Sequence, residues 1–176
     1  MSYTVEANDV AVPVRTYLNE CVDVERFLQY CRECGNYDRR WSCPPFHFPP
    51  LQLWRQYDHL RLFSRVLFPA EDETLPDLLQ GMLREKARLR SELLALEKRN
   101  LGSLALSAGG CNLCGDDCTR PEGKPCRNLS EMRYSIDALG GDIGKTMKTY
   151  FHRPIVWIQN GEVPEYLTLM GGLLLK

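Results

Sequence analysis

Eight cysteines fall into two groups in this 176-residue chain, and that grouping constrains the fold more than any other feature. The members are Cys21, Cys31, Cys34 and Cys43 in the first group, and Cys111, Cys114, Cys118 and Cys126 in the second. Each group contains a Cys-x2-Cys pair, a spacing at which one turn of backbone presents two thiolates to a single metal ion or cluster. Four thiolates match the requirement of tetrahedral zinc or of one iron–sulfur cluster. The sequence therefore predicts two metal sites, each set in an irregular loop.

The expected redox compartment supports metal binding over disulfide formation. The first ten residues, MSYTVEANDV, show no basic region followed by an apolar stretch, so we expect no secretory signal and a cytoplasmic location. No apolar run approaches the about 18 residues that a membrane span requires. In a reducing cytosol, clustered cysteines indicate metal sites or redox chemistry, although four disulfides are the alternative. The net charge of −1 gives no indication of a nucleic-acid or membrane partner.

The chain is long enough for one domain with a buried core, and we find neither repeats nor a linker. Residues 1–176 are therefore predicted to form a single domain that contains both cysteine groups, at residues 21–43 and 111–126. The strand candidates are Val10–Tyr17, Leu60–Phe68, Ser103–Ala108, Ile155–Ile158 and Tyr166–Leu175, with an Asn160-Gly161 turn between the last two. Short helices are expected over Asp23–Cys31 and Ser130–Leu139. This pattern predicts an α/β (α+β) fold, a mixed sheet with flanking helices in a single compact domain.

The longest helix signal runs from Thr74 to Asn100. Thr74, followed three residues later by Asp77, resembles a capping box. The apolar stripe of this helix consists of Leu75, Leu79, Met82, Leu89, Leu93 and Leu96. The stripe permits a coiled-coil partner helix, but further leucines widen it beyond a narrow seam. We therefore expect the helix to pack on the protein's own sheet.

The stretch around the first group suits a loop that wraps a metal. Gly35 lets the backbone turn directly after Cys34, and Pro44 after Cys43 matches the Cys-Pro ending of bacterial ferredoxin cluster loops. The aromatic residues of this stretch are either a lid that excludes water from a cluster or ordinary core residues: Tyr37, Trp41 and Phe46.

The fourth ligand of the first group is open to two interpretations. Cys21 precedes the Cys-x2-Cys pair by nine residues and is either a ligand or a buried free thiol. If Cys21 is a ligand, the first cluster is fully bound by thiolates and suits electron transfer. If it is not, one iron has an open position, which His47 or His59 could fill.

The second group is the more compact one. Gaps of two, three and seven residues separate its cysteines, and Gly109-Gly110 gives the backbone freedom in front of them. We therefore expect all four thiols to be ligands. Four cations surround these cysteines in the sequence and either stabilise the reduced form of an anionic cluster or form a solvated basic face: Arg120, Lys124, Arg127 and Arg133.

Zinc is the alternative metal. A single zinc bound between two Cys-x2-Cys pairs usually has a gap of about 15–20 residues between the pairs, far shorter than the separation in this chain. Two separate four-cysteine zinc sites are possible. The long spacers to the outlying cysteines and the Cys-Pro-Pro exit after Cys43 favour iron–sulfur loops.

The motifs around both groups resemble a known family, domain of unknown function family 2284, whose members are predicted metal-binding proteins. The resemblance covers most of the chain and rests on Cys31-x2-Cys34-Gly-Asn-Tyr, Trp41-Ser42-Cys43-Pro44-Pro45, Cys111-x-Leu113-Cys114, Pro125-Cys126-Arg127 and Ala138-Leu139-Gly140-Gly141-Asp142-Ile143. It implies an iron–sulfur type of metal binding and does not imply a particular activity. The ligands that it implies are Cys31, Cys34, Cys43, Cys111, Cys114, Cys118 and Cys126.

The sequence as a whole predicts a protein that holds two [4Fe–4S] clusters and passes single electrons to or from a partner redox enzyme. One alternative is a redox enzyme or activator that uses an open iron site at the first cluster. Another is a zinc-stabilised interaction module with the Leu-rich helix as its partner surface. Metal and sulfide content distinguish the iron–sulfur predictions from the zinc module.

Overall fold

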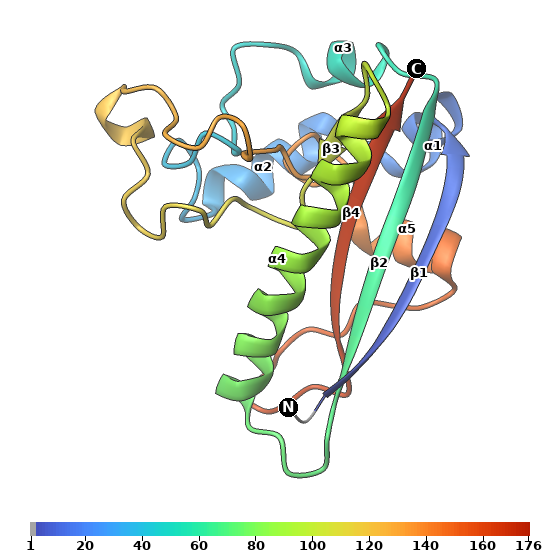
Figure 1. The fold of residues 1–176 in the computed structure, drawn as a ribbon, viewed down its shortest axis with the longest axis vertical. Coiled ribbons are helices and arrows are strands. Elements are labelled where there is room, and N and C mark those ends of the chain that lie inside the picture. Colours follow the sequence, from blue (N-terminus) through green and yellow to red (C-terminus); the bar gives the residue numbers. More distant parts are fainter. Residues whose placement is uncertain (1–2) are drawn as a thin grey trace.

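The structure is a computed structural model and describes residues 3–176. Over these residues one four-stranded sheet, in the order β1-β2-β4-β3, carries helices on both faces (Figure 1). Its strands are β1 (Tyr3–Pro13), β2 (His59–Pro69), β3 (Leu104–Leu106) and β4 (Leu167–Leu175). The helices are α1 (Val14–Cys21), α2 (Val24–Glu33), α3 (Pro50–Trp54), α4 (Leu75–Arg99), α5 (Ile143–Phe151) and the 3-10 turn η1 (Arg120–Glu122). The predicted α+β class, with helices around one sheet, is confirmed.

The direction of strand pairing differs from the mixed sheet that the sequence predicts. Within residues 3–176, the ladders β1–β2, β2–β4 and β3–β4 are all antiparallel. Strands β2 and β3, which α4 connects, do run parallel to each other. Strand β4 lies between them and pairs with both, so the expected parallel ladder does not form.

The two central strands, β2 and β4, contribute side chains to two hydrophobic clusters, one on each face of the sheet. Side chains alternate along a strand, so neighbouring residues point to opposite faces. Leu60 and Leu62 of β2 join the cluster that includes residues of α1, α3 and α5, whereas Phe63 and Leu67 join the cluster under α4. Burial on both faces explains why β2 and β4 read as nearly continuous apolar runs.

Helix α4 packs on the sheet of its own chain, as predicted. The Thr74 hydroxyl accepts a hydrogen bond from the Asp77 backbone N–H at 3.3 Å, which confirms the capping prediction. Gly171 in β4 allows the helix to approach closely, because a Cβ atom there would lie 2.7 Å from Leu93 Cδ1. The buried line of the helix consists of Leu78, Gly81, Glu85, Leu89 and Leu93.

Three predicted elements differ from the structure. The first strand begins earlier than predicted and ends at Pro13, where α1 starts. Residues 155–158 form no strand, although Asn160 and Gly161 do form a turn with positive φ angles of 53° and 73°. Residues 130–139 form turns that insert apolar side chains into the core, and the helix begins later, at α5. There the Asp142 side chain accepts a hydrogen bond from the Lys145 N–H at 2.8 Å.

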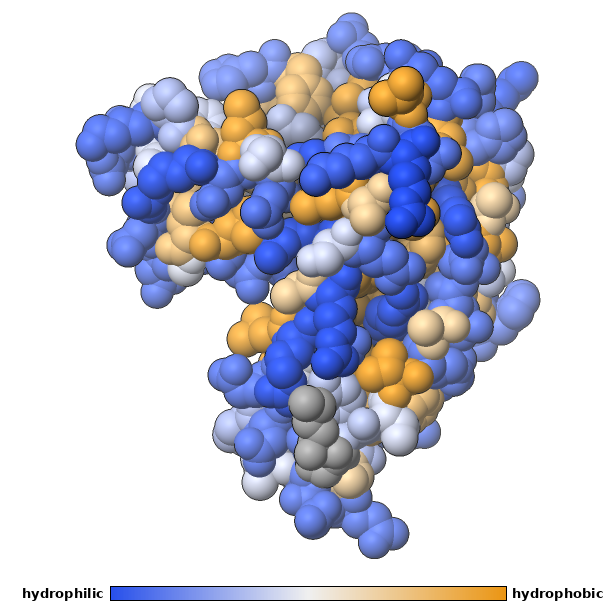
Figure 2. Space-filling view, viewed as in Figure 1, coloured by the Kyte–Doolittle hydropathy of each residue, from blue (hydrophilic) through white to orange (hydrophobic). Residues whose placement is uncertain are grey.

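Two irregular segments lie together to one side of the sheet, where α2 also reaches (Figure 1). We call residues 34–49 the first loop, residues 107–128 the second loop, and the two together the cysteine arm. In Figure 2 the arm stands out from the rest of the molecule, leaves a notch beneath it, and mixes hydrophilic and hydrophobic residues on its surface. Within residues 3–176, no helix combines the length and the apolar character that crossing a bilayer demands.

Candidate metal centre

All eight cysteines carry free thiols in the structure. Cys31 lies in the last turn of α2 and Cys34 directly follows that helix, so the helix end fixes the spacing of the first Cys-x2-Cys pair. Cys43 lies in the first loop and is buried. The four cysteines of the second group all lie in the second loop and are partly buried.

The four thiol residues of the second group line one small cavity. The lining also includes two residues of the first loop and two residues that follow the cysteines: Arg40, Trp41, Asn128 and Met132. Burial raises the pKa of the Cys111 thiol, the Leu113 backbone N–H opposes this shift, and the other three thiols of the group add to the rise. The structure therefore brings together the four residues that the sequence assigns to one site.

Asn128 makes a specific contact to one of these thiols. Its amide Nδ2 lies 2.9 Å from Cys114 Sγ and donates a hydrogen bond to it. An N–H group directed at a sulfur stabilises the negative charge that the sulfur carries as a thiolate. Asn128 therefore favours the form of Cys114 that binds metals.

Three cysteines of the first group are also neighbours. Burial raises the pKa of Cys31 to about 11, and the Asp137 carboxylate, Cys43 and Cys34 contribute further to this rise. Burial likewise raises the pKa of Cys43, whereas its contact with the Ser42 hydroxyl lowers it. A metal would have to displace protons from these thiols, so metal binding there would be pH-dependent.

Cys21 lies apart from the other members of the first group. It is the last residue of α1, is only 2% exposed, and belongs to the hydrophobic cluster that contains Tyr17 and Trp54. Burial raises the pKa of its thiol and a hydrogen bond with Thr146 opposes the shift. Its backbone carbonyl accepts a hydrogen bond from the Asp142 N–H at 2.7 Å. The structure thus brings seven cysteines into groups of three and four, and packs Cys21 in the core.

The thiols surround their cavity without meeting at one point. Among residues 3–176, no three Cys, His, Asp or Glu side chains are arranged to hold a metal ion as they stand. The donor set of the second group nevertheless fits a metal, since four soft thiols face one cavity and have no disulfide partner. Gly109 and Gly115, both with positive φ, give the backbone beside Cys111 and Cys114 turns that other residues adopt less readily.

Two arginines tie the loops of the arm to each other, one from each side. Arg40 of the first loop donates to the carbonyls of Cys111 at 3.1 Å and Gly115 at 2.7 Å. Arg120 of the second loop donates to the carbonyls of Arg40 at 2.9 Å and Pro45 at 2.5 Å, and also to that of Cys43. These charge-assisted bonds satisfy carbonyls that no regular structure pairs. Each loop therefore holds the backbone of the other.

Trp41 and Ser42 complete the contact between the loops. The Trp41 indole N–H donates to the Lys124 carbonyl at 3.1 Å and to Thr119 Oγ1 at 3.3 Å. The Ser42 hydroxyl is fully buried, accepts a hydrogen bond from the Cys111 N–H at 3.0 Å and lies 3.6 Å from Cys43 Sγ. The two cysteine groups are therefore adjacent, with one serine side chain between them.

The second loop is also fixed to the sheet and to α4. The Arg133 guanidinium makes a two-pronged ion pair with the Glu97 carboxylate, with N–O distances of 2.8 and 2.5 Å. Glu97 also accepts a hydrogen bond from the Ala105 backbone N–H of β3 at 2.6 Å. Upstream of the cysteines, Lys86 Nζ of α4 donates to the Gly110 carbonyl at 2.5 Å, and burial lowers the pKa of this lysine.

The basic residues predicted around the second group are engaged with other partners. Arg133 pairs with Glu97, Lys124 pairs with Glu122 at 2.6 Å, and Arg127 donates to the Asp117 carbonyl. The cation that lines the thiol cavity is instead Arg40, which sequence reasoning missed along with Asn128. Arg40 lies 71 residues before Cys111 in the sequence, and no spacing rule singles out Asn128, so the sequence gave no signal that would have identified either residue.

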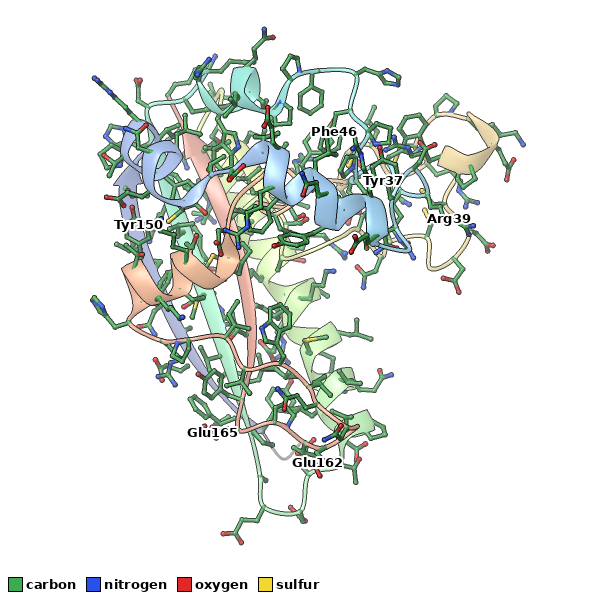
Figure 3. All side chains as sticks on the ribbon, turned by 180° about the vertical axis from the view of Figure 1, so that it is seen from behind. Tyr37, Arg39, Phe46, Tyr150, Glu162 and Glu165 are labelled. Atoms are coloured by element: carbon green, nitrogen blue, oxygen red, sulfur yellow. The ribbon has the colours of Figure 1, made fainter. Side chains whose placement is uncertain are left out.

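The remaining candidates occupy different places. Trp41 lines the thiol cavity of the second group, although the sequence places it among the residues of the first group. Phe46 lies in an aromatic cluster, with its ring centroid 5.0 Å from those of Phe48 and Tyr134. His47 is exposed in the first loop, and His59 begins β2 within the sheet. Figure 3 shows Tyr37, Arg39 and Phe46 on the arm, on the opposite side of the molecule from Tyr150.

Comparison with known proteins gives one match. The profile of DUF2284, described as a predicted metal-binding protein, matches residues 18–175. No curated protein and no solved structure matches the chain. The match extends over both cysteine groups and over the fold from the second half of α1 to β4, and leaves out β1.

Proposed function

The chain belongs to DUF2284, the family of predicted metal-binding proteins, and from this premise we propose an iron–sulfur protein that carries single electrons to or from a partner redox enzyme. The observation that carries the proposal is the placement of Cys111, Cys114, Cys118 and Cys126 around one cavity. A [4Fe–4S] cluster, when bound by four such thiolates, accepts and releases one electron at a time.

In this proposal the residues around the thiols contribute shielding from water, a positive charge and a hydrogen bond to sulfur. Trp41 and Met132 cover the cavity and limit the access of water. Arg40 brings a positive charge to a site whose four thiolates are negative, while the Asn128 amide donates to Cys114 Sγ. Hydrogen bonds to sulfur and solvent access are the means by which a protein sets the potential of such a centre.

Iron–sulfur binding agrees better than zinc with the construction of the site. A structural zinc site needs only a compact four-ligand knuckle. Here an aromatic ring, a cation and an amide from outside the cysteine motif face the thiols, and an amide donates to a sulfur. Such outer contacts matter most for a centre whose charge changes during function.

Metal analysis of anaerobically purified protein tests this proposal. We expect iron and acid-labile sulfide in equal amounts, about four of each per cluster, with a broad visible absorbance that dithionite bleaches. Replacing Cys114 with serine should remove the second centre and halve the iron and sulfide. Two zinc ions without sulfide would contradict the proposal and support the zinc-stabilised module.

One observation favours a second candidate, an open metal position at the first centre. Cys31, Cys34 and Cys43 are neighbours, whereas Cys21 is packed in the core, in the hydrophobic cluster that contains Tyr17 and Trp54. Three thiolates leave one position of a four-ligand site for a substrate, a small molecule or another protein group. A redox enzyme or activator would use that position.

Replacing Cys21 with serine separates the two candidates. The open-site candidate expects the Cys21→Ser protein to keep the iron and sulfide of the first centre, although its stability falls because a hydroxyl enters the apolar core. Cyanide should then alter the electron paramagnetic resonance signal of that centre in both the wild type and Cys21→Ser. Loss of half of the iron in Cys21→Ser would instead assign Cys21 as a ligand and support the plain carrier.

A further inference from the structure

A second cavity of the arm shares one lining residue with the thiol cavity. It has a volume of about 230 Å³ and is lined by Asp38, Trp41, Pro45, Phe46, His47 and Arg120. Trp41 also lines the thiol cavity, so a single indole ring forms part of both walls. A molecule in this pocket would therefore contact a side chain that also lines the thiol site.

The aromatic walls of the pocket are held in place before any molecule enters. The Trp41 indole N–H donates to the Lys124 carbonyl, and the Arg120 guanidinium lies over the Trp41 ring at 5.4 Å from its centroid. Phe46 stacks on Phe48 with an angle of 12° between the rings. Fixed walls lower the entropy that binding must offset. Trp41 and Phe46 give the pocket two aromatic walls, and electron-rich aromatic groups attract flat, electron-poor rings.

Arg120 does not offer its charge to an anion. Its Nε and Nη2 contact Asp38 Oδ1 at 3.2 and 3.1 Å, and the remaining N–H groups donate to the carbonyls of Arg40, Cys43 and Pro45. Its side chain is only 7% exposed. A phosphate or carboxylate would have to break these bonds, so anion binding does not explain the pocket.

The polar residues of the pocket determine which hydrogen-bonding groups a bound ring should carry on its edge. The Asp38 side chain is 66% exposed and, as a carboxylate, accepts hydrogen bonds only. The exposed His47 imidazole both donates and accepts when neutral. A ring with an N–H group beside carbonyl oxygens satisfies both residues. A plain quinone has no N–H for the carboxylate.

We propose that this pocket is a binding site for a flat, electron-poor heteroaromatic ring with an N–H edge, and that the oxidised isoalloxazine ring of a flavin occupies it. The volume is slightly below the range of about 300–1,000 Å³ that is usual for whole ligands, so the pocket holds the ring and leaves the ribityl chain outside. A redox role for the flavin beside the thiol site rests on the function proposed above. The binding of the flavin ring does not depend on that function.

Titration with riboflavin tests the proposal on anaerobically purified protein. We expect saturable, one-to-one quenching of riboflavin fluorescence, because the bound ring would contact the Trp41 indole, which lines the pocket. Phe46→Leu keeps an apolar side chain but removes one aromatic face, and His47→Ala removes one hydrogen-bonding group. Each should weaken binding about three- to tenfold. Phe27→Leu and His59→Ala, which alter residues outside the pocket, should leave it unchanged.

Three results would overturn the proposal. The first is the absence of saturable quenching up to about 1 mM riboflavin. The second is binding that neither pocket variant weakens; because His47 is exposed, His47→Ala decides the matter if Phe46→Leu fails to fold. The third is much tighter binding of flavin mononucleotide than of riboflavin, since this would indicate a phosphate site. Metal and sulfide analysis of the same sample shows independently whether the iron–sulfur proposal holds.

Discussion

The Ser42 hydroxyl accepts a hydrogen bond from the Cys111 backbone N–H at 3.0 Å and joins the two cysteine groups. Ser42 directly precedes Cys43 in the first loop, and Cys111 is the first cysteine of the second loop. The serine side chain is fully buried, so water could not replace its hydroxyl as the partner of this N–H group. Ser42 therefore helps to fix the relative position of the two groups, together with the contacts of Arg40 and Arg120.

Ser42→Ala should destabilise the protein and loosen the arm. The substitution leaves the Cys111 N–H buried without a partner, which costs about 1–3 kcal/mol. Urea denaturation followed by circular dichroism measures the loss, and the reaction of the thiols with a disulfide reagent should become faster. Ser130→Ala, at an exposed serine, should do neither. An unchanged urea midpoint in Ser42→Ala would show that the hydrogen bond does not hold the loops together.

Arg40→Lys should weaken metal binding at the second group while the protein stays folded. Lysine keeps the charge, but its single ammonium cannot reproduce the two contacts to the carbonyls of Cys111 and Gly115. Outer contacts of this kind are typically worth about 10–100-fold in metal affinity. A chelator competition assay on the reconstituted protein measures the change.

Arg39→Lys is the matched control for that substitution. Arg39 is the neighbouring residue and is exposed on the arm (Figure 3). Equal losses of metal affinity in Arg39→Lys and Arg40→Lys would show that the arm responds to any local change, and would remove the specific role of Arg40.

Glu97→Gln should lower stability near neutral pH and have a smaller effect in acid. Burial alone would raise the pKa of Glu97, but the hydrogen bonds from Arg133 and from the Ala105 N–H outweigh it, and the pKa is lowered. A carboxyl with a lowered pKa in the folded state stabilises the protein above its unfolded pKa of about 4.3, and this contribution is lost as the pH falls through the folded value.

Urea midpoints at pH 7 and pH 4 measure this effect. At pH 7 we expect Glu97→Gln to lose about 1–3 kcal/mol, since a buried charge-assisted pair is broken. At pH 4 the difference from the wild type should shrink. Glu71→Gln, at an exposed residue, should show no difference at either pH. A pH-independent loss in Glu97→Gln would mean that packing, rather than the charge, accounts for the effect.

The parts of the fold that local rules determine were predicted correctly. The cap at Thr74 and the apolar strands β2 and β4 depend on residues close in sequence. Helix α5 was missed because Gly144 and Thr146 are weak helix formers, and only the cap at Asp142 and the apolar spacing of the segment marked it. The antiparallel pairing was missed because β4, the last strand, inserts between β2 and β3.

The sequence predicted only those parts of the candidate site that the spacing of the cysteines defines. The second group comes together because its members share one loop. The environment of Cys21 depends instead on α1, where Val14, Tyr17 and Cys21 are buried at helical spacing. That spacing was a signal, but a strand was expected over Val10–Tyr17. The contacts of Arg40 join segments about 70 residues apart, and a single sequence gives no rule for such pairs.

Asn128→Ala should lower the reduction potential of the second centre. The amide donates to Cys114 Sγ at 2.9 Å, and a hydrogen bond to a sulfur stabilises the reduced state more, because that state is more negative. A hydrogen bond worth about 1 kcal/mol corresponds to about 40 mV for a one-electron couple. A redox titration followed by electron paramagnetic resonance should therefore show a shift of that order towards more negative potential. Asn112→Ala, at an exposed position in the same loop, should leave the potential unchanged. A shift to more positive potential in Asn128→Ala would show that the amide does not act on the sulfur as a donor.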